Sequence, residues 1–247
     1  MRPNALILAC ALFAAGAAAA EVEVNASASN LAFHTLDSTD DAILTNQTRL
    51  RLTAEGSLGL PGARSAGDLS WFAAYDHQAL AGGLVESPDF AAIEAIAEPT
   101  RLDVEGELAD GGSYTWQHRL YRATVAFDWG GGAVRLGRQR VAWGSGRLWN
   151  PTDRFNPVAP LALEPAEKTG VDAVAATWRV PPFGSVQVVA GPGSGERNVT
   201  RKLALRWRDT LGETDYAILA GRIGDEDVIG IDLTANLYGG GARIEAA

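Results

Sequence analysis

The feature that most constrains this chain is a two-residue alternation of apolar and polar side chains. In the segment 119–129, for example, Tyr121 and Phe127 share one face while Arg122 and Thr124 occupy the other. The same pattern recurs in the segments 48–56, 68–77, 200–208 and 228–237. Because successive side chains of a β-strand point to opposite faces, the pattern predicts strands with one apolar and one polar face. Strands of about 9–11 residues are long enough to cross a bilayer when tilted.

The connections between these predicted strands alternate between short and long. Short turns are expected at 130–132, 181–184 and 209–213, and long loops at 78–113 and 144–170. If the first strand spans 22–34, all the short turns lie at one end of the sheet and both long loops lie at the other. Outer-membrane barrels have short periplasmic turns and longer outer loops. The alternation therefore predicts that the long loops face the outside of the cell.

Alternation alone does not separate a soluble β-sandwich from a membrane barrel, because both have one apolar and one polar face. Two further features favour the barrel: arginines recur on the polar faces, and tryptophans lie toward the predicted periplasmic strand ends, as in an aromatic girdle. These tryptophans are Trp71, Trp129, Trp178 and Trp207. We therefore predict an all-β fold, an antiparallel transmembrane β-barrel.

The two ends of the chain carry separate signals. Residues 1–20 combine a positive start at Arg2, an apolar run and small final residues, which is typical of a secretory signal peptide; the alternative is a buried N-terminal helix. Cys10, the single cysteine, lies in this segment. Residues 21–247 are then predicted to be a partial outer-membrane β-barrel. Since 242–245 reads as the start of an eleventh strand and single-chain bacterial barrels have an even number, we expect a barrel truncated at its C-terminus.

The segment 134–172 contains the most distinctive motifs, LGRQ, WG, GRLWNPTDRFNP and GVDA. Together they resemble bacterial outer-membrane porin-like β-barrels, near the alginate-export-type barrels, over about 118–178. The resemblance implies an outer-membrane protein that passes solutes, without specifying the solute. Its expected partners are outer-membrane lipid, lipopolysaccharide, the barrel-assembly machinery and the transported solute, with no nucleic acid and no cofactor.

The polar faces of the predicted strands collect basic side chains, which we expect to line the pore. They are Arg49, Arg51, Arg122, Arg179, Lys202, Arg206 and Arg208. The strand that starts at Val134 breaks the pattern, because Arg138 and Arg140 fall on its apolar parity. A β-bulge at Gly137 would correct this, although Gln139 would then turn toward lipid. With the bulge, the pore also gains Arg135, Arg138 and Arg140.

Acidic residues on the same predicted faces are fewer, namely Glu55, Asp76, Asp128 and Asp232. A chain with a net charge of −9 would thus carry a positive pore wall, which favours anionic solutes. The alternative is that the arginines pair with acids and only fill the lumen. Many of the remaining acids lie between 78 and 113, where they form a solvated loop face or bind divalent ions at the lipopolysaccharide layer.

The long loop 144–170 carries apolar anchors and charges that suit a constriction. The residues concerned are Arg147, Trp149, Asp153, Arg154 and Phe155. Loops longer than about 15 residues are usually functional or disordered, and these anchors favour an ordered loop. Two interpretations stay open: the loop folds into the pore as a constriction, or it caps the barrel rim.

The function predicted from these observations is passive passage of small or oligomeric, anionic solutes across the outer membrane. The alternative is a non-transporting structural or adhesive barrel that is plugged by its own loops. No enzyme is predicted, because no motif joins His34, His77 or His118 to a serine, and the sequence has neither a metal-ligand cluster nor a phosphate-binding loop.

Overall fold

The computed structural model describes residues 21–36, 41–58, 67–96, 99–145, 150–156, 168–196, 198–237 and 240–247. The predicted signal peptide lies outside the described residues, as do Arg147 and Trp149 of the long loop. In the described part of the chain, no helix is long and apolar enough to cross a membrane.

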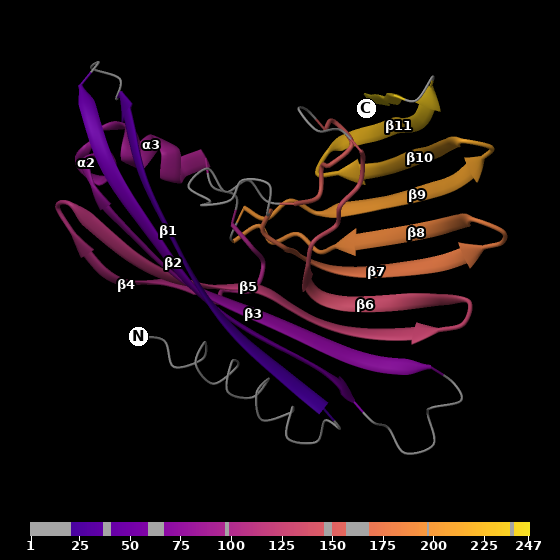
Figure 1. Cartoon of the computed structure of the whole chain (residues 1–247), viewed down its shortest axis with the longest axis horizontal. Coiled ribbons are helices and arrows are strands. Elements are labelled where there is room, and N and C mark those ends of the chain that lie inside the picture. Colours follow the sequence, from indigo (N-terminus) through magenta and orange to yellow (C-terminus); the bar gives the residue numbers. More distant parts are fainter. Residues whose placement is uncertain are drawn as a thin grey trace.

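The described residues form one antiparallel, 12-stranded sheet, which confirms the all-β prediction (Figure 1). The first half contains β1 (Glu21–Leu36), β2 (Ala42–Leu58), β3 (Asp68–Gly82), the helices α2 (Gly83–Glu86) and α3 (Asp89–Ile96), β4 (Glu105–Gly111) and β5 (Tyr114–Trp129). The second half contains β6 (Gly132–Gln139), β7 (Val171–Val180), β8 (Gly184–Gly191), β9 (Lys202–Leu211), β10 (Thr214–Ile223), β11 (Glu226–Leu237) and β12 (Gly240–Ala246). Strands neighbour one another in chain order, except that β4 pairs only with β5.

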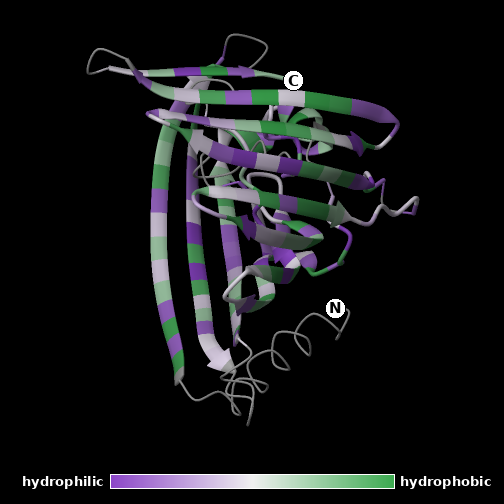
Figure 2. Ribbon diagram, turned by 90° about the vertical axis from the view of Figure 1, so that its right-hand side faces the viewer, coloured by the Kyte–Doolittle hydropathy of each residue, from purple (hydrophilic) through white to green (hydrophobic). Residues whose placement is uncertain are grey.

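The sheet is strongly curved, and it is open. The two views show β1 to β5 as one wall and β6 to β12 turning away from it as a second wall (Figures 1 and 2). In the described residues, the order of strands ends at β1 on one side and at β12 on the other, and these two edges do not pair. Closure into a barrel stays a prediction.

The two faces of the sheet differ in chemistry. We call the face that carries Arg51 and its cross-strand neighbour Asp76 the inner face, and the opposite one the outer face. Hydrophobic and hydrophilic residues alternate along many strands (Figure 2), so each strand contributes to both faces. The outer face exposes large apolar side chains from β2 to β12, including Leu50, Leu52, Leu136, Val174, Trp178, Leu205, Trp207, Ile218, Ile229 and Ile244.

The predicted bulge at Gly137 is wrong. Pairing of β6 is regular on both sides, from Gly132 to Arg138 against β5 and to Gln139 against β7. The ladder instead shifts in β5, where Tyr121 is the extra residue opposite the step from Ala74 to Tyr75 in β3. Gly137 has φ +110°, and a Cβ there would lie 2.2 Å from the carbonyl oxygen of Ala123. Glycine is therefore required by the close approach of two backbones, not by an unpaired residue.

The expected long loop at 78–113 is also corrected. β3 continues to Gly82, two helices follow, and β4 forms a hairpin with β5 through the turn at 112–113. The acidic, glycine-containing sequence of β4 lacks a strand-like alternation, and the strand forms because β5 offers a free edge there. The short turns between β5 and β6, β7 and β8, and β9 and β10 lie where they were predicted.

Candidate functional site

The inner face holds most of the basic residues that were expected on the pore wall. By strand register these are Arg49, Arg51, Arg122, Arg135, Arg179, Lys202, Arg206 and Arg208. Arg140 follows the end of β6 and lines the same cavity as Arg122 and Arg135. Strand parity therefore placed these side chains correctly, because it depends only on the local two-residue period.

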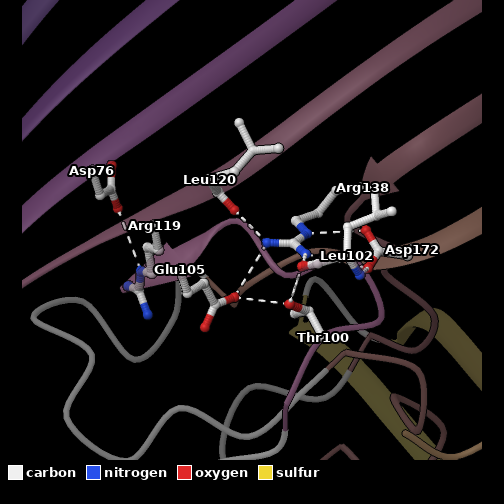
Figure 3. Close-up of polar contacts among 8 residues, drawn as sticks. All are labelled: Asp76, Thr100, Leu102, Glu105, Arg119, Leu120, Arg138 and Asp172. Atoms are coloured by element: carbon white, nitrogen blue, oxygen red, sulfur yellow. Dashed lines mark hydrogen bonds and ion pairs between the residues drawn. The ribbon is translucent and has the colours of Figure 1, made fainter. Parts of the chain in front are cut away.

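Arg138 does not belong to this set, and its assignment to the pore wall is wrong. Register places it beside Leu136, Val174 and Asp172 on the outer parity, and it is only 1% exposed. Its guanidinium donates to Asp172 Oδ1 through Nε at 3.0 Å, and to Thr100 Oγ1 and the Leu102 carbonyl at 2.6 and 2.7 Å (Figure 3).

The guanidinium of Arg138 is buried because it lies at a point where the sheet divides. We call this point, residues 120–122 of β5, the fork. From Ala123 onward β5 pairs with β6, whereas its residues up to Arg119 pair with β4. The carbonyl of Leu120 falls between the two partners, and Arg138 donates to it at 2.7 Å (Figure 3). A buried backbone carbonyl needs a partner, so Arg138 completes the sheet at the point where two neighbouring strands separate.

A second group of arginines surrounds Tyr121 on the inner face. Arg51 forms a two-point ion pair with Asp76, at 2.6 and 2.8 Å, and its guanidinium lies 3.8 Å from the centre of the Tyr121 ring. Arg122 and Arg119 lie 4.7 and 5.8 Å from the same ring. Cation–π contacts of this kind stabilise guanidinium groups near an aromatic face. Arg51 therefore matches the alternative given above, in which an arginine pairs with an acid and fills space inside the sheet.

The long loop, where it is described, lies on the inner face of the sheet. We call residues 140–145 and 150–156 the inner loop. Trp143 and Phe155 are each 1% exposed, meet edge to face at 4.7 Å, and pack in one cluster with Val189 of β8 and Leu219 of β10. Trp143 Nε1 also donates to Gln187 Oε1 at 2.5 Å. The described part of the loop is thus packed inside the curve of the sheet.

Polar contacts hold the inner loop against β9, β11 and β12. Ser145 Oγ donates to Asp232 at 2.6 Å, and Thr152 Oγ1 donates to Glu245 at 3.0 Å. The Nζ of Lys202 donates to the carbonyl oxygen of Phe155 at 2.6 Å. Two further ion pairs join Asp153 to Lys168 and Arg154 to Glu226. Of the loop residues expected at a constriction, Phe155 is an anchor, while Asp153 and Arg154 are paired.

Residues of the inner loop line two cavities. One, of about 810 Å³, is lined by residues of β1, β2, β3, β5 and β6 and by Arg140. The other, of about 680 Å³, is lined by residues of β9 to β12 and by Ala142, Gly144 and Ser145. Arg140 and Ser145, close together in the sequence, therefore belong to different cavities. The two cavities have no described lining residue in common.

Several residues of this site were not singled out from the sequence. Gln187 and Glu23 lie within alternating segments or next to them, so parity alone could have placed both on the polar face. Tyr121 was expected on the apolar face, opposite Arg122, and that expectation is wrong: Tyr121 is the extra residue of the bulge in β5, and its ring lies beside Arg51 on the inner face. The contacts of Ser145 and Glu245 join residues one hundred positions apart. No local pattern carries such a signal.

The described residues contain no group of three or more His, Cys, Asp and Glu that could hold a metal ion. Two of the histidines, His77 and His118, face each other across β3 and β5 on the outer parity. The hydroxyl of Tyr75 contacts Nδ1 of His118, and Trp116 lies beside His77. This outer-face cluster is separate from the inner loop and its cavities.

Fold and site together define a curved antiparallel sheet with an apolar outer face and a polar inner face crossed by a loop. Comparison of the chain with protein-family models, curated proteins and solved structures gave no match.

Proposed function

We propose that the protein is an outer-membrane channel for the passive passage of small or oligomeric, anionic solutes. The observation that carries the proposal is the contrast between the two faces. Large apolar side chains stand exposed on the outer face across the sheet, with Ile229 77% exposed, while arginines lie on the inner face. A soluble protein rarely exposes apolar surface of this extent. A lipid-facing outer wall around a water-filled interior has this distribution.

The inner loop supports a constriction within such a channel. It lies inside the curve of the sheet and is held by apolar anchors and by hydrogen bonds to Asp232 and Glu245. Outer-membrane lipid, lipopolysaccharide and the barrel-assembly machinery are the partners that this function requires. The resemblance of segment 134–172 to porin-like barrels of the alginate-export type points the same way.

Arg135 and Arg140 are suited to a test of ion selectivity, because both are exposed, line the larger cavity and form no ion pair among the described residues. Their positive charges should raise the local concentration of anions. In planar lipid bilayers under a salt gradient, the variant Arg135→Gln/Arg140→Gln should shift the reversal potential toward cation preference. The shift should shrink as salt rises, because charges are screened over about 10 Å at roughly 0.1 M salt.

The matched control is Arg201→Gln/Arg222→Gln, which removes two exposed positive charges outside both cavities. We expect its reversal potential to equal that of the wild type. An unchanged ion preference in a folded Arg135→Gln/Arg140→Gln protein would remove the arginine-selectivity proposal. A protein that inserts into bilayers but never conducts would favour the non-transporting structural or adhesive barrel.

A further inference from the structure

The larger cavity on the inner face has two walls of opposite charge. Arg122, Arg135 and Arg140 line it from β5, β6 and the first residue of the inner loop. Glu23 of β1 and Glu55 of β2 line it from the other side. Its volume of about 810 Å³ is within the range of small-molecule sites, and Phe72 contributes an apolar surface.

The charges on both walls are left uncompensated within the described residues. Glu23 and Glu55 are direct cross-strand neighbours, a placement in which like charges destabilise a sheet. Both are exposed, and neither forms an ion pair in the described part of the chain. Asn25 Nδ2 donates a hydrogen bond to Glu23 Oε1 at 2.8 Å. Such an arrangement costs stability unless a cation is available to the pair.

Within the residues that the structure describes, the arginines on the opposite wall lack anionic partners, just as the two glutamates lack cationic ones. Arg122 donates only to neutral oxygens, the Tyr121 hydroxyl and the Lys168 carbonyl, and its buried Nε has no partner among the described residues. Arg135 and Arg140 are exposed and form no ion pair there. Guanidinium groups bind carboxylates through two parallel hydrogen bonds, so three of them on one wall suit a carboxylate ligand.

We propose that this cavity is a binding subsite for zwitterionic solutes that carry a carboxylate and an ammonium group, such as amino acids and short peptides. The carboxylate binds at the arginine wall, and the ammonium binds between Glu23 and Glu55. This rests on the proposed channel and goes beyond its anion preference: the arginines can hold the carboxylate of an anion or of a zwitterion, whereas only a zwitterion also has an ammonium group that Glu23 and Glu55 can bind.

A matched series of three peptides tests the subsite: glycylglycine, its N-acetyl derivative without the ammonium group, and its C-terminal amide without the carboxylate. Calorimetric titration into the detergent-solubilised protein at low salt measures the affinity of each. We expect glycylglycine to bind about fivefold more tightly than either derivative, as one lost charge contact at an exposed site implies. Current block by the same peptides in bilayers provides the functional measurement.

Variants then assign the two walls. Glu23→Gln/Glu55→Gln should lower the affinity for glycylglycine to that for the N-acetyl derivative, and Arg135→Gln/Arg140→Gln should lower it to that for the amide. The control Glu196→Gln/Glu213→Gln removes two exposed acids that do not line the cavity, and it should leave all three affinities unchanged. Circular dichroism verifies that each variant retains its strands.

The outcomes separate this inference from the proposed channel. Equal binding of the three peptides, or tightest binding of the N-acetyl derivative or of the amide, would overturn the zwitterion subsite. If the protein conducts but binds no glycylglycine, the channel proposal stands and the subsite proposal is overturned. If the protein binds glycylglycine with the expected variant effects but never conducts, the subsite proposal stands and the channel proposal is overturned.

Discussion

At the scale of single residues, Arg138 shows how a charge is buried next to an apolar surface. Its neighbours on the outer parity, Leu136 and Val174, are exposed apolar side chains. The guanidinium itself is enclosed by Asp172, by Thr100 and by the carbonyl oxygens of Leu102 and Leu120. A buried charge is tolerated when it is paired and its hydrogen-bonding groups have partners. Arg138 is therefore a stabilising residue of the fork.

The substitution Arg138→Gln should strongly destabilise the protein. It leaves Asp172, 8% exposed, without its ionic partner, and removal of one member of a buried pair costs about 3–5 kcal/mol. Urea unfolding followed by tryptophan fluorescence measures the change in the free energy of unfolding. Arg135→Gln makes the same change three positions earlier on β6 at an exposed site, and its effect should stay within about 0.5 kcal/mol. Equal losses in the two variants would contradict the structural role of Arg138.

At the scale of elements, the inner loop combines two apolar anchors, Trp143 and Phe155, with a polar attachment between them in the sequence. Trp143 and Phe155 bury their rings against the second wall of the sheet. Glu245 of β12 accepts hydrogen bonds from the backbone of Ser145 and from the hydroxyl of Thr152. Because one carboxylate bridges two turns of the loop, it fixes their separation.

Replacement of Glu245 with alanine should loosen the inner loop. Hydrogen bonds to a charged group contribute about 1.5–3 kcal/mol each, and this change removes both while it leaves the Trp143 anchor intact. In bilayers we expect a higher single-channel conductance and more open-channel noise. The control Glu213→Ala removes an exposed carboxylate from a turn, and it should change neither quantity. Identical traces for the two variants would show that the loop does not restrict the pore.

At the scale of the whole molecule, the antiparallel order places alternate connections at opposite ends of the sheet. The tight turn at 130–131 between β5 and β6 lies at one end, and the connection at 192–201 between β8 and β9 lies at the other (Figure 1). In an outer-membrane protein the short turns face the periplasm. The connection between β8 and β9 should then face the outside of the cell.

Single cysteines at Gly195 and Gly130 test this orientation. At both positions a Cβ would meet no atom within 4 Å, so neither substitution should disturb the fold. Without the predicted signal peptide, residues 21–247 contain no other cysteine. In intact cells a membrane-impermeant thiol reagent should label Gly195→Cys and not Gly130→Cys, whereas both should react after cell lysis. The reverse pattern would invert the topology, and equal labelling in intact cells would contradict it.

The sequence by itself determined most of the strands and most of the residues on each face. Alternation of side chains is a local property of extended backbone, so the parity of Arg51, Arg206 or Leu205 could be assigned without knowing any neighbouring strand. The short turns were equally local, because glycine and proline specify them. These two signals were enough to predict an all-β antiparallel sheet and most of the basic inner wall.

Only the tertiary structure decided which strands meet and what lies between them. The bulge falls at Tyr121 and not at Gly137, because β5 must pair with β3 on one side and with both β4 and β6 on the other. Arg138 is not part of the basic inner wall. It is buried where β4 and β6 separate along β5, and there it donates a hydrogen bond to the carbonyl of Leu120. The opposed charges of Glu55 and Arg135 share a cavity because the sheet curves, and curvature depends on contacts among many strands rather than on any one segment.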